Sequence, residues 1–143
     1  MYLLDTNILI VAIRHPAAEC TKKLASHLGK DVCISVITYA ELEYGILNSS
    51  NPDRNREAVR HILAGIPILS FGIKEAQTFG SILAELKADN KMKQNQDRDK
   101  MIAAHARANG YTLVTANTKD FKDIRGLKFE SWIEPGDTDN HKI

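Results

Sequence analysis

The chain has 143 residues, a length that fits one domain built around one hydrophobic core. Its 19 Lys and Arg residues nearly balance its 18 Asp and Glu residues, and the formal charge of +1 excludes a protein that attracts nucleic acid over its whole surface. The 2 cysteines have no metal-ligand spacing and follow no secretory start, so we expect a cytoplasmic protein without disulfides or structural zinc. No apolar run approaches the ~20 residues that cross a bilayer.

The first part of the chain repeats a strand followed by a helix. An apolar run at residues 2–4 stops at a polar turn, and apolar residues 8–11 follow, which predicts a strand and then a helix. The β-branched run at residues 32–37 ends at Thr38 and predicts a second strand that leads into a second helix. A turn cluster at residues 48–53, followed by apolar residues at helical spacing, predicts a helical hairpin.

The middle of the chain contains a weaker strand and two helices. Residues 66–71 predict a short strand, and their proline places that strand at a sheet edge or at the start of a strand. Residues 75–86 predict an amphipathic helix, and residues 87–98 predict a polar loop. A helix of small residues then begins at Asp99 and ends before Gly110, which can adopt the left-handed conformation that closes a helix.

The alternation of strands and helices predicts the fold class. Residues 111–115 and 126–129 complete the set of expected strands. Strands separated by helices indicate an α/β protein with a mostly parallel central sheet and helices on both faces. We expect residues 1–133 to form this domain and residues 134–143 to form a polar, flexible tail.

Three acidic residues lie in or near turns that lead from strands into helices: Asp5, Glu41 and Asp99. In sheets of this class the ligand site lies beyond the carboxyl ends of the strands, so these acids are expected to converge. Carboxylates that share a site raise one another's pKa unless a cation is present. Oxygen ligands without a His or Cys cluster suit Mg²⁺ or Mn²⁺, and hydrolysis of a phosphate ester is the reaction class that fits such a site.

Each of these acids also has a purely structural interpretation. Asp5 could cap the helix that follows it. Thr38 and Glu41 have the spacing of a capping box, in which the two side chains bond to each other's backbone N–H groups. Asp99 lies among other charged residues and could be part of a solvated helix start. The residues alone leave these alternatives open.

The ordered motifs resemble a known family. Residues 4–7, 38–42, 99–106 and 113–121, taken together and in this order, resemble the PIN-domain toxins of the VapC family. The similarity runs from about residue 1 to residue 132 and so covers almost the whole chain. No single motif is specific to the family, and the resemblance depends on the ordered set.

The resemblance implies an activity and partners. Proteins of this family are magnesium-dependent endoribonucleases, for which Mn²⁺ can substitute, and a small VapB-like antitoxin holds them inactive. The substrate implied is RNA, with transfer RNA among the candidates. A homodimer is also implied, and the many apolar positions at residues 8–13 and 73–86 favour one if they exceed what a single small core absorbs.

The resemblance also assigns roles to residues. By position, the metal-binding acids are Asp5 and Asp99, the third acid is Glu41, and the fourth, more variable acid is Asp120. Asp123 is the alternative to Asp120. The supporting polar residues are Thr6, Asn7, Thr115 and Asn117.

One stretch departs from the family pattern. Many relatives have a Gly-Pro turn just before the third acidic motif, where this chain has Asn, Gln, Asp and Arg at residues 95–98. Asp97 therefore competes with Asp99 for the role of metal ligand. The small apolar residues 102–104 fix the helical register and favour Asp99.

Two further features near the third motif have a functional and a structural interpretation. His105 lies ~9 Å along the helix axis from Asp99, at 1.5 Å per residue, so we expect a structural role for it. A basic run could hold the RNA backbone or could be a solvated face. Its members are Lys87, Lys91, Lys93, Arg98 and Lys100.

Two rival functions remain. A phosphatase with an aspartyl nucleophile requires a second Asp two positions after Asp5, where this chain has Asn7. A catalytically silent PIN-fold module would bind RNA or protein without cutting. The presence of all the site acids argues against such a loss of activity.

Overall fold

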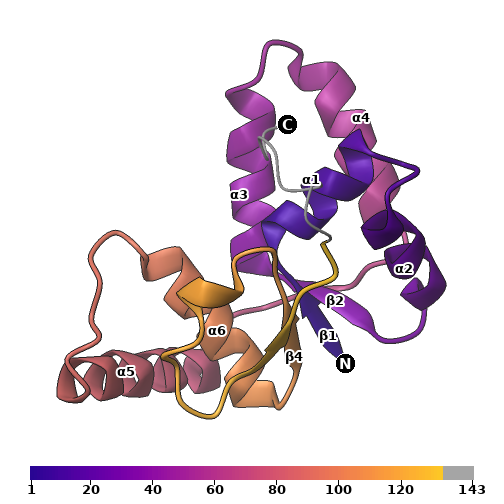
Figure 1. Ribbon diagram of the computed structural model, residues 1–143. Coiled ribbons are helices and arrows are strands. Elements are labelled where there is room, and N and C mark those ends of the chain that lie inside the picture. Colours follow the sequence, from indigo (N-terminus) through magenta and orange to yellow (C-terminus); the bar gives the residue numbers. More distant parts are fainter. Residues whose placement is uncertain (134–143) are drawn as a thin grey trace.

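The computed structural model describes residues 1–133, and the tail expected at residues 134–143 lies outside the described residues. In the described part, five strands form one sheet in the order β3-β2-β1-β4-β5, and each neighbouring pair is parallel (Figure 1). The strands are β1 (Tyr2–Leu4), β2 (Val32–Ser35), β3 (Ile68–Leu69), β4 (Thr112–Val114) and β5 (Lys128–Glu130). The expected parallel α/β sheet is confirmed, and β3 is an edge strand as its proline predicts.

Six α-helices in this part of the chain cover both faces of the sheet. They are α1 (Thr6–Arg14), α2 (Glu19–His27), α3 (Val36–Leu47), α4 (Pro52–Leu63), α5 (Ile73–Ala88) and α6 (Asp97–Asn109). Figure 1 shows α5 and α6 together on one side, apart from α1 to α4. Within residues 1–133, no helix is both long enough and apolar enough to cross a membrane.

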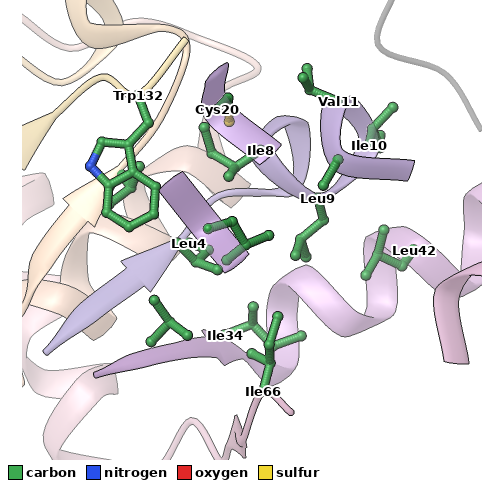
Figure 2. Close-up of a cluster of buried hydrophobic side chains, with 14 of the residues drawn as sticks. Leu4, Ile8, Leu9, Ile10, Val11, Cys20, Ile34, Leu42, Ile66 and Trp132 are labelled. Carbon is green, nitrogen blue, oxygen red and sulfur yellow. The ribbon is translucent and has the colours of Figure 1, made fainter. Parts of the chain in front are cut away.

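Alternation along the strands divides the core into two clusters, because successive side chains of a strand point to opposite faces. Leu3 belongs to the cluster beneath α5 and α6, whereas Leu4 belongs to the cluster beneath α1 to α4. Figure 2 shows Leu4 and Ile34 of the sheet beside Ile8 of α1, with Trp132 closing the same cluster. Full burial of one such side chain stabilises the fold by roughly 1.5–3 kcal/mol. The two clusters fix the sheet, and thereby the positions of the turns at its carboxyl edge.

Several boundaries differ from those expected, three of them in the segments that carry Glu41 and Asp99, and the α2 helix is new. The second strand ends at Ser35, and α3 begins at Val36 because the Ser35 hydroxyl accepts a hydrogen bond from the N–H of Ile37 at 3.0 Å and caps the helix. The capping box expected for Thr38 is therefore wrong. The last long helix begins at Asp97, two residues before Asp99. The α2 helix was not predicted because it buries few side chains.

Most of the apolar positions that favoured a homodimer lie in the chain's own core. The apolar side chains of α1, from Ile8 to Val11, are all buried within this chain's own core. Ile13, the last of the apolar positions expected there, is only partly buried. On α5, Ile82 and Leu86 are likewise buried, and only Ile73 at its start is strongly exposed.

Candidate active site

The carboxyl end of β1 positions the first acid. The β1 strand stops at Leu4, and Asp5 caps α1 by accepting a hydrogen bond from the N–H of Thr6 at 2.8 Å. Its second carboxylate oxygen accepts a hydrogen bond from the Thr115 hydroxyl, also at 2.8 Å. Asp5 is therefore a helix cap, as the structural interpretation expects, and its other oxygen is held by the segment that follows β4.

The polar residues expected to support the site form one network across the edge of the sheet. The Thr115 hydroxyl oxygen accepts a hydrogen bond from the N–H of Asn117 at 3.1 Å. The side-chain oxygen of Asn7 accepts one from the N–H of Ala116 at 3.2 Å. These bonds join the turn after β1 to the turn after β4, so that Asn7 and Thr115 are held in place beside Asp5.

The second acid comes from α3. Glu41 is the sixth residue of this helix, too far from its start to cap it. Its Oε2 accepts a hydrogen bond from Nη1 of Arg98 at 3.0 Å. The Glu41 side chain is 18% exposed and that of Arg98 is 68% exposed, so the pair lies at the mouth of the site with the acid on the inner side.

The third acid completes a pocket of about 240 Å³. Asp99 lies in the first turn of α6. The pocket is lined by Asp5, Thr6, Asn7, Ile10, Glu41, Arg98, Asp99 and Asn117. The side chain of Asp97 is 79% exposed, does not line the pocket, and lies 4.0 Å from the ammonium group of Lys100. The geometry therefore favours Asp99 over Asp97.

The electrostatics of the pocket follow from burial and from mutual repulsion of the acids. Burial raises the pKa of Asp5, although the hydrogen bonds from Thr115 and Thr6 oppose the shift. Burial also raises the pKa of Glu41, and the charge of Arg98 lowers it. Burial, followed by repulsion from Asp5 and Asp120, raises the pKa of Asp99 to about 6. Without a cation, the site is strained by its own negative charge.

Asp120 does not line this pocket but lines a neighbouring crevice, and Asp99 lines both. Asp120 ends a short 3-10 helix, η1 (Thr118–Asp120), and lines this narrow crevice together with Asp99 and Asp123. Its charge raises the pKa of both Asp5 and Asp99. Asp120 is thus near the three acids without lining their pocket, and Asp123 shares its crevice.

Two neighbours on α6 do not line the pocket. The His105 side chain is buried, its Nδ1 lies 2.8 Å from the hydroxyl of Ser35, and its ring meets that of Phe71 edge to face. Burial lowers its pKa, and its role is structural as expected. Lys100 is also buried, and its ammonium group donates a hydrogen bond to the carbonyl of Lys93 at 2.6 Å. The interpretation of Lys100 as part of an exposed basic face is therefore wrong.

The donor set fits a hard divalent ion that keeps part of its water shell. Within residues 1–133, no three Asp, Glu, His or Cys side chains converge closely enough to hold one ion between them. Mg²⁺ needs only one or two protein carboxylates, because it retains several waters. The pocket supplies oxygen ligands only, and the hydroxyl of Thr6 lies among them.

Both the sequence and the fold of this chain match a known family. The sequence pattern of the PIN domain matches residues 2–127, and the chain belongs to that family. Within the family it belongs with the VapC ribonuclease toxins, as its motifs indicate.

Three relatives support this assignment. Ribonuclease VapC2 of Haemophilus influenzae is 39% identical over 132 residues, which cover 92% of this chain and 98% of the relative. The tRNA(fMet)-specific endonuclease VapC of Shigella flexneri is 36% identical over 131 residues, which cover 92% and 97%. The crystal structure of VapBC2 from Rickettsia felis, bound to a DNA fragment from its promoter, matches with a TM-score of 0.84 at 33% identity, and the match covers 92% of this chain and 98% of that one.

The sequence did not predict the pairing of Arg98 with Glu41. Arg98 stood among five basic residues with no feature that set it apart, although it lies in the stretch that departs from the family pattern. The two residues are 57 positions apart, and only the packing of α3 beside α6 brings them together. The hydrogen bond from Thr115 to Asp5, across 110 positions, depends in the same way on the pairing of β1 with β4.

Proposed function

We propose that this chain is a magnesium-dependent endoribonuclease that acts as a toxin and is neutralised by a small VapB-like antitoxin. The observation that carries the proposal is the pocket lined by three acids from different helices: Asp5 at the cap of α1, Glu41 within α3 and Asp99 in the first turn of α6. Raised carboxylate pKa values in one pocket are a mark of functional sites, because a fold has no structural need for such repulsion.

Asp5 and Asp99 are the residues that would hold the ion. When bound, a divalent cation polarises a phosphodiester and activates water for attack on it. The chain's own part is to hold the ligands still: Thr115 and the backbone N–H of Thr6 fix both oxygens of Asp5. Such supporting bonds typically change metal affinity or activity by about 10–100-fold when removed. Asp120, in the crevice that shares Asp99 with the pocket, acts through water or on a more weakly held ion.

The phosphatase alternative lacks its second acid. The residue two positions after Asp5 is Asn7, and its side-chain oxygen is engaged by the backbone N–H of Ala116. An amide in that role cannot protonate a leaving group.

Mn²⁺ is expected to replace Mg²⁺ in the proposed ribonuclease, since both ions prefer oxygen ligands.

The names of the relatives suggest the substrate and the partner to test first. One relative is a tRNA(fMet)-specific endonuclease, and another was solved as a VapBC assembly. Initiator tRNA is therefore the first substrate to test, and the product of a neighbouring reading frame is the first candidate antitoxin.

We also propose that the protein forms a homodimer. Light scattering that finds only monomer at micromolar concentration would contradict this.

The function is tested by incubating the protein with initiator tRNA in Mg²⁺, in Mn²⁺ and in EDTA. The expected result is discrete fragments with either metal, none in EDTA, and recovery when excess Mg²⁺ is added. Equal cutting in EDTA contradicts the metal requirement. Binding of the tRNA without cutting in any buffer supports the silent module, and release of phosphate from small esters supports the phosphatase.

A further inference from the structure

Arg98 stands out among the residues of the acidic pocket. Among the described residues that line this pocket, it has the only positive side chain. It is the second residue of α6 and so directly precedes Asp99 in the chain. As a lining residue, Arg98 lies close to whatever occupies the pocket.

The guanidinium group has unused donors. An arginine carries five N–H donors in a rigid fork. Within residues 1–133, Arg98 makes one side-chain hydrogen bond, from Nη1 to Glu41, and 68% of its side chain is exposed. The remaining donors are therefore accessible at the mouth of the pocket, and Glu41 limits the rotation of the group that carries them.

We propose that Arg98 is a substrate-binding residue that holds a phosphate group of the RNA backbone at the mouth of the pocket, with Glu41 as its positioning residue. This inference rests on the proposed ribonuclease function. RNA approaching Asp5, Glu41 and Asp99 meets a cluster of negative charge, and a cation at the rim offsets that repulsion. The planar fork of arginine matches two phosphate oxygens better than a lysine ammonium does.

The other basic residues of the expected run are less suited to this role. Lys100 is buried and bonded to the carbonyl of Lys93. Lys91 and Lys93 line the crevice beside Asp120 and not the pocket. Arg98 is therefore the member of the run that faces the three acids.

In an alternative role, which we call the latch, the ion pair of Arg98 with Glu41 prevents a metal ion from binding to Glu41. The strength of the ion pair argues against this. Exposed ion pairs contribute only about 0.2–1 kcal/mol, because water screens them. A contact of that size changes the affinity for a divalent ion by no more than about fivefold, whereas the other donors of Arg98 stay available to a phosphate throughout.

The experiment measures binding of fluorescently labelled initiator tRNA by anisotropy, in EDTA, at KCl concentrations from about 50 to 200 mM, the range over which phosphate contacts show a strong salt dependence. The variants are Arg98→Gln and Arg98→Lys. The matched control is Arg60→Gln, because Arg60 on α4 is 66% exposed and is also paired with an acid, Glu57. Calorimetric titration of the same proteins with Mn²⁺, without RNA, gives a second readout.

The expected result is that Arg98→Gln weakens tRNA binding about tenfold and reduces the slope of log K against log salt by about one. Arg98→Lys keeps the slope but binds more weakly than the unaltered protein, and Arg60→Gln changes neither quantity. An unchanged slope in Arg98→Gln overturns the inference and leaves the proposed function standing. If Arg98→Gln binds Mn²⁺ more than about fivefold more tightly than the unaltered protein, and its salt slope is unchanged, the inference is overturned in favour of the latch. If the unaltered protein neither binds nor cuts the tRNA, the proposed function fails together with the inference.

Discussion

Acidic residues in two regions of this molecule have opposite electrostatic environments. At the C-terminal end of α5, two acids have a partner: Glu85 accepts two hydrogen bonds from Arg107, at 2.7 and 2.9 Å, and Asp89, the C-cap, is paired with Arg125. These partners lower the pKa of both acids. At the carboxyl edge of the sheet, burial and mutual repulsion raise the pKa of the acids instead.

The difference separates acids that stabilise the fold from acids that cost it stability. A paired carboxylate holds two elements together, as Glu85 of α5 and Arg107 of α6 do. The carboxylates of the pocket repel one another, and the charge of Arg98 offsets this repulsion without cancelling it, since the pKa values of all three acids stay raised. Proteins keep such unfavourable clusters where function requires them. The comparison therefore predicts that substitution of a pocket acid lowers activity and raises the stability of the metal-free protein. Substitution of a paired acid should lower stability and leave activity unchanged.

The largest effect is expected from Asp5→Asn. This change removes one of the two proposed metal ligands but keeps a side chain that can cap α1, so cleavage of initiator tRNA should slow by more than the ~100-fold that loss of a supporting residue causes. Single-turnover cleavage at saturating Mg²⁺ measures the effect. Asp97→Asn is the control, because Asp97 lies outside the pocket. Equal rates for Asp5→Asn and Asp97→Asn would refute the assignment.

Asp120→Asn should have a smaller effect on the same assay. Asp120 lies outside the pocket, in the crevice that it shares with Asp99, so its removal should slow cleavage by about 10–100-fold. A defect larger than that of Asp5→Asn would mean that the ligands are wrongly assigned. Full activity would remove Asp120 from the site and make Asp123, in the same crevice, the next residue to test.

Asp99→Asn should stabilise the metal-free protein at neutral pH. The pKa of Asp99 is raised from 3.8 to about 6, so the folded state holds its proton more tightly than the unfolded state does. The stability that this proton supplies is present below pH 3.8 and is lost as the pH rises through about 6. The variant avoids this loss and should be more stable by about 2 kcal/mol at pH 7, with little difference at pH 3.5. Thermal melting in EDTA at both pH values measures this, and a destabilised variant at pH 7 would instead indicate that Asp99 serves only the helix start.

Glu85→Gln should show the opposite and smallest change. The pKa of Glu85 is lowered by Arg107, so its contribution to stability is present above its normal pKa of 4.5 and is lost as the pH falls through the folded value. At pH 7 the variant should lose about 1 kcal/mol and keep full cleavage activity. Melting curves and the tRNA assay measure the two quantities. A loss of activity with unchanged stability would remove the distinction between the two regions.

The sequence predicted the type and order of most elements, because local signals specify them. The alternation of apolar runs predicted the parallel sheet, and Gly110 ends α6 in the left-handed conformation as expected. The start of α3 was placed wrongly, since Thr38 and Glu41 have the spacing of a capping box while Ser35 is the cap. Two rules of local chemistry competed there, and only the position of β2 in the sheet decides between them.

The site was predictable as a set of residue types but not as a set of contacts. Asp5 and Asp99 follow from their places at helix starts and from the family resemblance, whereas Glu41 follows from the resemblance, because it lies at the sixth residue of α3. The bonds that hold them, from Thr115 to Asp5 and from Arg98 to Glu41, join residues far apart in the chain and depend on packing. No pattern along a single sequence encodes such pairs.

The central claim is that Asp5 and Asp99 together hold a divalent ion. Calorimetric titration of the metal-free protein with Mn²⁺, beside the double variant Asp5→Asn with Asp99→Asn, tests it most directly, since it requires neither substrate nor antitoxin. The account predicts binding to the unaltered protein and none to the double variant, while melting curves show that the variant remains folded. Binding of Mn²⁺ with the same affinity to both proteins would contradict it.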